Sequence, residues 1–327
     1  MLDVLTIGSA TVDHFLTISQ SFSSLKPGDK ILVTHSETHS GGGATNAAAA
    51  LAKLGLKVKM LAKLGDDHDA KFILQELKQY GVENICRRKS RHHTDTATLI
   101  SSTKDKNRII FVFKEASRDL ALTDVKAMAF KATFNAKWIY LGSLMGKSFQ
   151  VAKKIAQQAK KKSRSILFNP SQYLAQKGKQ YLKPILENTV ILVLNKEEAQ
   201  AVLGTQATDL KFLLRELQKT GPAMVVITDG RKKLYALKDK TVYSLLPPRV
   251  KIVDTAGAGD AFTAGFLGGM IKQYAFEDAL RLGQANASSV IQHHGCKQGL
   301  LTEREAGSIM KKWGIKVKKS LVKRPEL

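Results

Sequence analysis

Short apolar segments of strand length alternate with longer segments of helical periodicity along most of this 327-residue chain. A strand that is apolar on both faces must be covered on both faces, and helices between such strands supply the crossover connections. The sequence therefore predicts an α/β fold with a mostly parallel central sheet sandwiched by helices. The predicted strands are 2–8, 58–64, 137–144, 165–170, 189–195 and 224–230, and the predicted helices are 44–54, 67–80, 148–162, 196–203, 209–219, 258–272 and 276–293.

Two stretches interrupt this alternation. Residues 15–40 alternate in polarity and carry a Pro-Gly-Asp turn, and residues 95–113 predict a hairpin around the sequence KDKN. We expect a single domain over residues 1–327, in which segments at about 13–40 and 95–115 form a small antiparallel β-lid. Such a lid closes over an active site and excludes water, whereas the alternative is a simple extension of the main sheet. Unpaired lid edges would also allow a homodimer, although a monomer is compatible with the same pattern.

The chain is strongly basic. Lysine and arginine number 52 against 28 acidic residues, which gives a formal net charge of +24. The densest basic runs, 153–164 and 311–324, lack interleaved aromatic residues for base stacking, and no known nucleic-acid-binding signature is present. We interpret the charge as a solvated surface that favours anionic ligands such as nucleotides, with no specific nucleic acid as partner. A basic, non-catalytic nucleic-acid-binding protein is the alternative.

Several residue types carry little functional signal. Cys86 and Cys296 have neither metal-ligand spacing nor the pattern of a disulfide framework. The consecutive pairs His92–His93 and His293–His294 point apart in regular structure, which is poor metal geometry, and we interpret the second pair as partners of a helix C-terminus. No apolar run reaches membrane-spanning length, and the start MLDVLTIGSA lacks the layout of a signal peptide. We expect a cytoplasmic protein without a membrane partner.

The sequence DTAGAGDAF, residues 254–262, precedes a long apolar helical segment. If the helix starts near Gly257 or Ala258, the N–H groups of residues 256–260 have no intrahelical partner and face outward at the positive end of the helix dipole. The glycines leave the backbone open to an anion, and Asp260 stands beside this cradle as a base for an attacking hydroxyl. The loose transition state of phosphoryl transfer requires no strong base. Ordinary helix capping by aspartate is the alternative.

Two nucleotide-binding motifs are excluded. The segment GSLMGKS at 142–148 resembles a P-loop but has three residues, not four, between its first glycine and Gly-Lys-Ser. No Gly-x-Gly-x-x-Gly follows the first strand, so a dinucleotide-binding fold has no support.

Two separated motifs resemble one family. DTAGAGDAFTAGF is similar to the C-terminal signature of the PfkB, or ribokinase-like, carbohydrate kinases, and SGGGATNAAAALAKLG at 40–55 resembles their glycine-rich substrate loop. LGDDHDAKFILQELKQYGV, NPSQY, NKEEA and VVITDG follow in the family's order, so the resemblance covers about residues 3 to 305. It implies a ribokinase-like body with a β-lid that transfers the γ-phosphate of ATP to a hydroxymethyl group of a small sugar. A nucleoside kinase of the adenosine type and a sugar-phosphate kinase are the alternatives.

The resemblance also implies roles for individual residues. The implied catalytic set is the base Asp260 with the anion hole Gly257, Ala258 and Gly259, and the implied acceptor-binding set is Asp13, Gly42, Gly43 and Asn46. The implied nucleotide-binding set is Asn195, Thr228, Gly230, Asn286 and Gly295, with Glu198 on Mg²⁺ through water and Asp254 near a monovalent cation such as K⁺.

The chain departs from the family pattern at three places. Ala256 replaces the usual threonine or serine of the signature, and residues 231–233 are basic where many members carry a further glycine. Gly43 stands where ribose-specific members often have lysine, which weakens ribose itself as the acceptor. The motif around Asn195 and Glu198 is also compatible with a plain helix cap.

Overall fold

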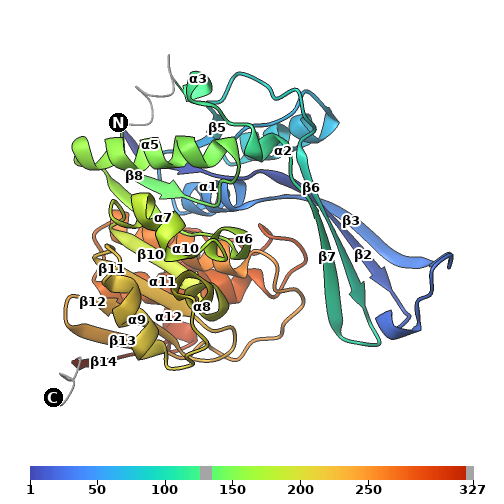
Figure 1. The fold of residues 1–327 in the computed structure, drawn as a ribbon. Coiled ribbons are helices and arrows are strands. Elements are labelled where there is room, and N and C mark those ends of the chain that lie inside the picture. Colours follow the sequence, from blue (N-terminus) through green and yellow to red (C-terminus); the bar gives the residue numbers. More distant parts are fainter. Residues whose placement is uncertain (126–134, 322–327) are drawn as a thin grey trace.

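A computed structural model describes residues 1–125 and 135–321, so residues 322–324 of the second basic run lie outside the described residues. It is an α/β body with a separate small sheet at one side (Figure 1). The larger sheet contains β1 (Leu2–Ile7), β4 (Val58–Leu61), β5 (Glu83–Asn84), β8 (Ala136–Leu141), β9 (Ser165–Phe168), β10 (Ile191–Asn195), β11 (Met224–Thr228), β12 (Leu234–Lys238), β13 (Thr241–Leu245) and β14 (Val317–Leu321). The longer helices are α1 (Gly43–Lys53), α2 (His68–Gln79), α5 (Lys147–Lys161), α7 (Gly178–Leu186), α8 (Lys196–Leu203), α9 (Leu210–Gln218), α10 (Ala258–Ile271), α11 (Phe276–Val290) and α12 (Glu303–Lys312), and the short ones are α3 (Leu122–Val125) and α6 (Gln172–Ala175).

The strand order of the large sheet is β14-β13-β12-β11-β10-β9-β8-β1-β4-β5. All pairings from β11 to β5 are parallel, and β12, β13 and β14 add an antiparallel extension at one edge. This confirms the predicted mostly parallel sheet. The antiparallel extension and the helices α6, α7 and α12 were not predicted.

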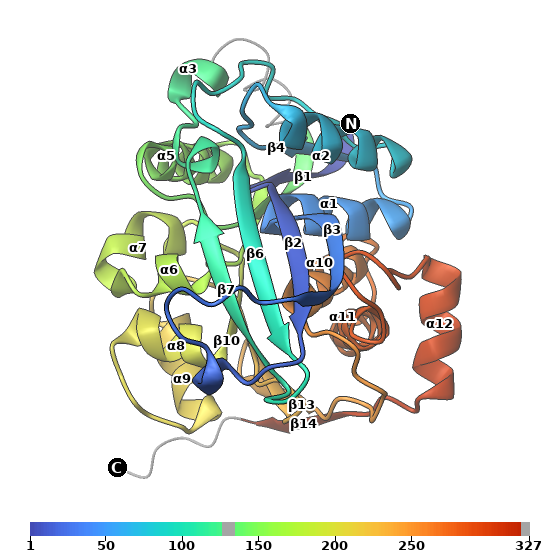
Figure 2. The same cartoon turned by 90° about the vertical axis from the view of Figure 1, so that its right-hand side faces the viewer.

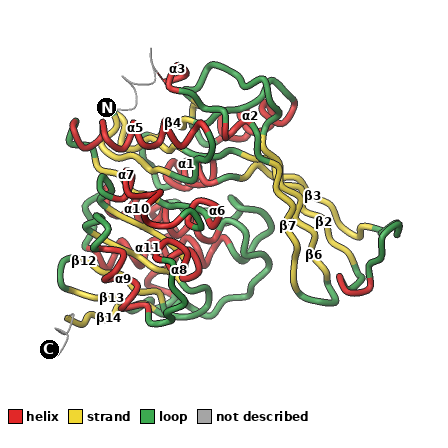
Figure 3. Tube along the Cα trace, viewed as in Figure 1, coloured by secondary structure: helices red, strands yellow, loops and turns green. Residues whose placement is uncertain are grey.

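Helices cover both faces of this sheet (Figure 3). Successive side chains of a strand point to opposite faces, and both neighbours in β1 are fully buried: Val4 joins the core with α1, α10 and α11, and Leu5 joins the core with α5, α7 and α9. The wholly apolar strands of the sequence therefore reflect a sheet with two cores. None of the helices in residues 1–125 and 135–321 has the length and apolar character needed to span a bilayer.

The lid is a four-stranded sheet of order β3-β2-β6-β7, formed by β2 (Thr11–Ile18), β3 (Val33–Gly41), β6 (Asp95–Ser102) and β7 (Asn107–Phe113). The outer pairs β2–β3 and β6–β7 are antiparallel, as predicted, but the central pair β2–β6 is parallel because both strands leave the body in the same direction. Figure 2 shows these strands spread across one side of the body.

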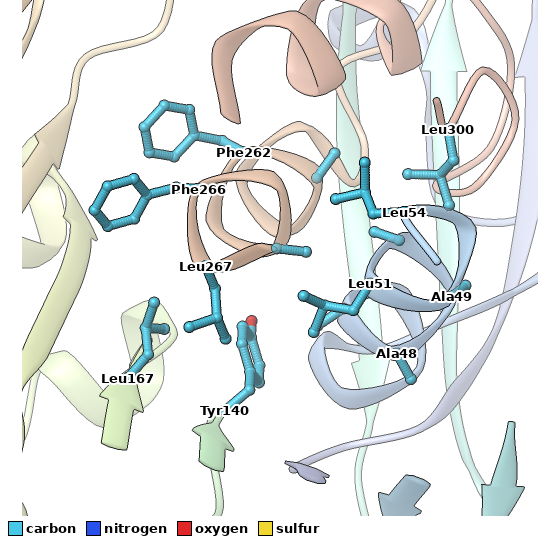
Figure 4. Packing of buried hydrophobic residues seen from close by; sticks show 14 of the residues in the cluster. Ala48, Ala49, Leu51, Leu54, Tyr140, Leu167, Phe262, Phe266, Leu267 and Leu300 are labelled. Atoms are coloured by element: carbon cyan, nitrogen blue, oxygen red, sulfur yellow. The ribbon is translucent and has the colours of Figure 1, made fainter. Parts of the chain in front are cut away.

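The helix that carries Asp260, α10, is held between α1 and α11 by small residues. A β-carbon on Gly283 of α11 would lie 2.7 Å from the carbonyl oxygen of Phe262, and one on Gly265 would lie 2.9 Å from the Cα of Gly283. On its other side α10 meets Leu51 and Leu54 of α1 (Figure 4). Close backbone packing therefore fixes where α10 begins.

We predict that Gly283→Ala lowers the free energy of unfolding by about 1–3 kcal/mol, because the added methyl group overlaps the backbone of α10. The matched control is Gly307→Ala in α12, where a β-carbon meets nothing within 4 Å. That control should stabilise by about 0.5–1 kcal/mol through helix propensity alone. Urea titration measures both variants, and equal effects of the two substitutions would contradict the packing argument.

Candidate active site

A cavity of about 280 Å³ lies at the carboxyl ends of the parallel strands, between the body and the lid. Crevices at this edge are where open α/β sheets bind their ligands. Most of its lining residues are glycines or carry a hydroxyl or amide group, although carbon atoms make up most of the exposed lining surface: Ser9, Thr11, Gly42, Gly43, Ala97, Val112, Lys114, Gly142, Ser143, Asn169, Ser171, Gln172, Tyr173 and Asp260. Three predicted residues, Gly42, Gly43 and Asp260, are therefore brought together here.

Asp260 stands in the first turn of α10, where the sequence placed it. Gly257 is the N-cap with φ of +74°, and a β-carbon there would lie 2.7 Å from the Cα of Cys296. Only glycine fits this left-handed position without strain. Gly259 has nothing within 4 Å of its missing β-carbon, so its backbone is open to a ligand.

The N–H groups ahead of α10 are not all free. The N–H of Ala256 donates to Asp254 Oδ1 at 3.0 Å, and the N–H of Ala258 makes a long bond of 3.4 Å to the carbonyl of Thr255. In the part of the chain that the structure describes, the N–H groups of Gly257, Gly259 and Asp260 make no hydrogen bond. The anion cradle is therefore narrower than residues 256–260, and Ala256 drops out of it.

Two side chains orient the Asp260 carboxylate. Asn46 of α1 donates its Nδ2 to Oδ2 at 2.8 Å, and the buried Tyr140 hydroxyl lies 3.5 Å from Oδ1 and 3.3 Å from the Asn169 Oδ1. Burial raises the pKa of Asp260 above its ordinary value, and the hydrogen bonds from Asn46 and Tyr140 work in the opposite direction. The result is a fixed carboxylate that accepts a proton more readily than an exposed aspartate.

The glycine-rich loop before α1 approaches this carboxylate closely. Gly42 has φ of +91°, and a β-carbon there would lie 2.6 Å from the carbonyl oxygen of Ser9, so a glycine is needed. A β-carbon on Gly43 would lie 3.7 Å from Asp260 Oδ1. A larger side chain at position 43 would therefore point straight at the base.

Asn46 was predicted to bind the acceptor, and its amide nitrogen is instead committed to Asp260. Its Oδ1 is buried without a hydrogen-bond partner among the described residues. A buried unpaired acceptor is costly, so this oxygen is available to a substrate hydroxyl.

Asp13 lies in β2, buried next to the glycine loop. Its Oδ1 accepts from the Thr11 hydroxyl at 2.8 Å, and its Oδ2 lies 3.9 Å from the Cys296 sulfur. Burial raises the pKa of Asp13, while the charge of the buried Lys297 lowers it. The Lys297 ammonium is bonded to the Ser40 carbonyl and to the Ser40 hydroxyl, so it braces the loop that ends in Gly42.

The predicted nucleotide-binding residues at two strand ends are neighbours. Asn195 and Thr228 are directly opposite in the β10–β11 ladder, and Gly230 follows with φ of +53° and open space around it. Asn195 and Glu198 form a capping box at α8, so the cap interpretation of this motif is correct. Burial nevertheless raises the pKa of Glu198 to about 7, with a further contribution from the charge of Asp260. A bound cation would favour the ionised form of this carboxylate.

Two other predicted nucleotide residues have structural tasks. Asn286 is fully buried in α11, where its Oδ1 accepts from the Leu301 N–H at 3.1 Å and its Nδ2 is buried without a partner among the described residues, so its place on the adenine side stays a prediction. Gly295, with φ of +82°, packs against the ring of His39, where a β-carbon would lie 3.0 Å from the ring. Both positions are therefore constrained by contacts within the chain, and their roles toward a nucleotide stay predictions.

Asp254 makes contact with the lid. Arg108 of β7 donates Nη1 to its Oδ1 at 2.6 Å, while its Oδ2 is buried without a partner among the described residues. The guanidinium thus supplies a positive charge to the carboxylate that the sequence assigned to a monovalent cation. The remaining oxygen is still free to serve as one ligand for such an ion.

One of the two histidines predicted as helix C-terminal partners contacts the end of α11. The His293 ring bonds to the Ser289 carbonyl at 3.1 Å, in the last turn of α11. Within residues 1–125 and 135–321, no group of three or more His, Cys, Asp or Glu side chains is arranged to hold a metal ion.

Sequence analysis missed the residues that complete the cavity. Asn169, Ser171, Gln172 and Tyr173 belong to the NPSQY segment, which was noticed only for its order in the chain. Tyr140 gave no signal because a tyrosine within an apolar strand reads as core. Lys114 and Arg108 were hidden among the many basic residues of the chain.

Comparison with known proteins identifies the family. Residues 1–303 match the pfkB family carbohydrate kinases. The chain therefore belongs to the pfkB family of carbohydrate kinases. A ribokinase from Bacillus subtilis is 28% identical over 314 residues, which cover 95% of this chain and 100% of the relative. A nucleoside kinase from Methanocaldococcus jannaschii is 25% identical over 302 residues, which cover 92% of this chain and 94% of the relative.

The fold is likewise that of known kinases. The structure of Arabidopsis thaliana ribokinase complexed with ribose and ATP superposes with a TM-score of 0.78 at 22% identity, covering 95% of this chain and 99% of that chain. The predicted ribokinase-like fold is thereby confirmed.

We predict that Asp260→Asn stabilises the ligand-free protein at neutral pH. A carboxyl whose pKa is raised by folding binds its proton more tightly when folded, so stability falls as the pH rises above the unfolded value of 3.8 and levels off above the folded pKa. The isosteric asparagine lacks this loss, so its stability advantage over the wild type should be absent near pH 4 and should grow as the pH rises. Denaturant titrations at several pH values measure it, and a pH-independent difference would contradict the raised pKa.

Proposed function

We propose that this protein is an ATP-dependent phosphotransferase that phosphorylates the hydroxymethyl group of a small sugar or of a sugar-bearing compound such as a nucleoside. The observation that carries the proposal is that the Asp260 carboxylate lines one cavity while the N–H of Gly259, its chain neighbour, is open to a ligand. A base beside an anion-attracting helix terminus suits a reaction in which an alcohol attacks a phosphoryl group.

In the proposed reaction, the acceptor lies on the glycine loop with its primary hydroxyl at Asp260. Asp260 takes the hydroxyl proton as the oxygen forms a bond to the γ-phosphorus of ATP, and the bond to the bridging oxygen breaks to release ADP. The N–H groups of Gly257, Gly259 and Asp260 hold the negative charge of the transferring group. Asn46 and Tyr140 keep the carboxylate aimed at the hydroxyl.

The donor side is proposed at the neighbouring strand ends. Asn195 and Thr228 lie at neighbouring strand ends, Gly230 has open space around it, and Glu198 just after Asn195 is close enough to Asp260 for that charge to raise its pKa. The likeness to a ribokinase bound to ATP supports this placement. Mg²⁺ would be bound by the nucleotide phosphates and water, with Glu198 as the nearby carboxylate, and it would neutralise phosphate charge. A monovalent cation fits the unpaired Oδ2 of Asp254.

We predict that Asp260→Asn lowers kcat by about 10²–10⁴-fold while leaving the KM for both substrates nearly unchanged, because only proton transfer is lost. Steady-state ADP release with the phosphorylated acceptor measures this change. The matched control is Asp239→Asn in the exposed β12–β13 turn, which should keep full turnover. A kcat within threefold of the wild type for Asp260→Asn would refute the proposed base.

We further infer a homodimer through the lid. β7 is the edge strand of the lid, and its consecutive apolar residues Ile109, Ile110, Phe111, Val112 and Phe113 are 38–58% exposed. An exposed apolar edge strand has unpaired backbone groups that can pair with a strand of another chain, and two copies of β7 could pair about a two-fold axis. Successive side chains of a strand point to opposite faces, so Ile109, Phe111 and Phe113 lie on the face opposite to Val112. Val112 lines the cavity, so these three residues can contact a second copy without entering the cavity.

We predict that the wild type sediments as a dimer at micromolar concentration and that Phe111→Glu converts it to a monomer, because a carboxylate is placed in the apolar seam. Leu74→Glu on the exposed face of α2 is the control and should leave the assembly unchanged. Analytical ultracentrifugation measures both, and a wild type that stays monomeric across the range argues against this assembly.

A further inference from the structure

Lys114 follows directly after β7 and lines two adjoining cavities. One is the acceptor cavity beside Asp260, and the other, of about 290 Å³, is lined by His92, Lys114, Glu115, Arg118, Asp119, Gly146 and Lys147. The P-loop-like segment 142–148 runs along both, with Gly142 and Ser143 at the first cavity and Gly146 and Lys147 at the second. Lys114 is the side chain that the two spaces share.

Lys114 is largely withdrawn from solvent and uncommitted. Burial lowers the pKa of its ammonium, and the charges of Asp95 and Asp13 partly offset that effect. It makes no ion pair or hydrogen bond with any residue that the structure describes, and its nearest defined partner is the ring of Tyr173 at 5.9 Å. Asp95 is already occupied by the N–H groups of Glu115 and Ser117 and by the Ser117 hydroxyl.

A neutral sugar gives no reason for this arrangement. Among the described residues that line the acceptor cavity, only Asp260 and Lys114 carry a full charge. Asp260 is the proposed base, and Lys114 is a cation without an ion-pair partner. Withdrawing an ammonium from water is costly unless an anion compensates it. The compensating anion is therefore to be sought on the ligand.

The second cavity continues the same charge pattern. Of its two carboxylates, Asp119 accepts from the Ser90 hydroxyl and lies 3.8 Å from the Lys147 ammonium, and Glu115 lies 3.8 Å from the His92 ring, which is a charged partner only when it is protonated. Arg118 has no ion-pair partner in residues 1–125 and 135–321. Lys114 and Arg118 thus present two free positive charges to one space.

We propose that the acceptor is an anionic sugar, whose carboxylate or phosphate group is bound by Lys114 at the end of the cavity away from the transferred phosphoryl group. This assignment rests on the proposed kinase function and adds the substrate class. A carboxylate needs only Lys114, whereas the larger phosphate extends into the second cavity and also engages Arg118. Neutral sugars and nucleosides leave the Lys114 ammonium buried and unpaired and bind less well.

The test compares matched acceptors that each carry a free hydroxymethyl group: D-glucose with D-gluconate, and D-fructose with D-fructose 6-phosphate, within a wider panel of aldoses, aldonates and sugar phosphates. Turnover is followed by ADP release from the full-length protein. The wild type should prefer the anionic member of a pair at least tenfold in kcat/KM. Lys114→Gln should raise its KM by about 10- to 100-fold, since a hydrogen bond to a charged group is lost, while neutral acceptors are unaffected.

Two further variants sharpen the result. Lys114→Arg keeps the charge and should keep most of the preference, and Lys104→Gln at the exposed lid tip is the control for a general loss of positive charge. A comparable rise in KM for Arg118→Gln with phosphates identifies a sugar phosphate as the acceptor. A rise confined to Lys114→Gln with carboxylates identifies a sugar acid.

Inorganic phosphate gives a readout that does not depend on finding the right sugar. At constant ionic strength, it should raise the melting temperature of the wild type and of Lys104→Gln more than that of Lys114→Gln. Equal phosphate effects in all variants, or neutral acceptors used as well as anionic ones, would overturn the inference and leave the kinase function standing. If no acceptor is phosphorylated and Asp260→Asn matches the wild type, the kinase function itself fails and the inference falls with it.

Discussion

The site depends on holding the largely buried Asp260 carboxylate next to backbone N–H groups that attract anions. These two demands conflict, because the same helix terminus that draws in a phosphate also stabilises the ionised Asp260. The structure separates them in space. Burial raises the pKa of the Asp260 carboxylate, and the hydrogen bonds from Asn46 and Tyr140 fix its orientation, whereas Gly257 and Gly259 leave the backbone N–H groups open to a ligand. One turn of helix can then serve both the attacking alcohol and the group that is attacked.

That turn is only as well placed as the helix that carries it. The interior of α10 is rich in glycine and alanine, so its backbone lies directly against α11 and α1. Packing at this density leaves few alternative positions for the helix axis. The glycine loop before α1 is braced from the far side by Lys297 and Ser40, and it delivers Asn46 to the same carboxylate. Asp260, the glycine loop before α1 and Asn46 are therefore held together by packing and hydrogen bonds.

The sequence predicted the parts of the fold whose physics is local. Apolar strands such as β10 and β11, buried on both faces, are evident from composition alone. The strand β14, with the sequence VKKSL, is nearly all exposed and carries no such pattern, and α7 contains Pro184. The parallel pairing of β2 with β6 could not be foreseen, because strand direction across a lid depends on how distant segments leave the body.

The same limit applies to the site. Glycine positions and Asp260 were predictable because a helix start and its open N–H groups follow from neighbours in sequence. Tyr140, Asn169, Lys114 and Arg108 act through contacts that span 29 to 146 residues, as the Tyr140–Asn169 and Arg108–Asp254 pairs show. Asn286 and Gly295 show a related limit, because the sequence did not reveal that contacts with Leu301 and with the His39 ring also constrain these two positions.

The ion pair between Arg108 and Asp254 has a consequence for the order of events. Asp254 lies just ahead of the N–H groups that would receive a polyphosphate, and Arg108 of the lid strand β7 offsets its negative charge. If the lid moved away from the body, Asp254 would lose this partner and its negative charge would repel an arriving nucleotide. Closing the lid over a bound acceptor would restore the ion pair and remove that repulsion, so acceptor binding would favour nucleotide binding through electrostatics.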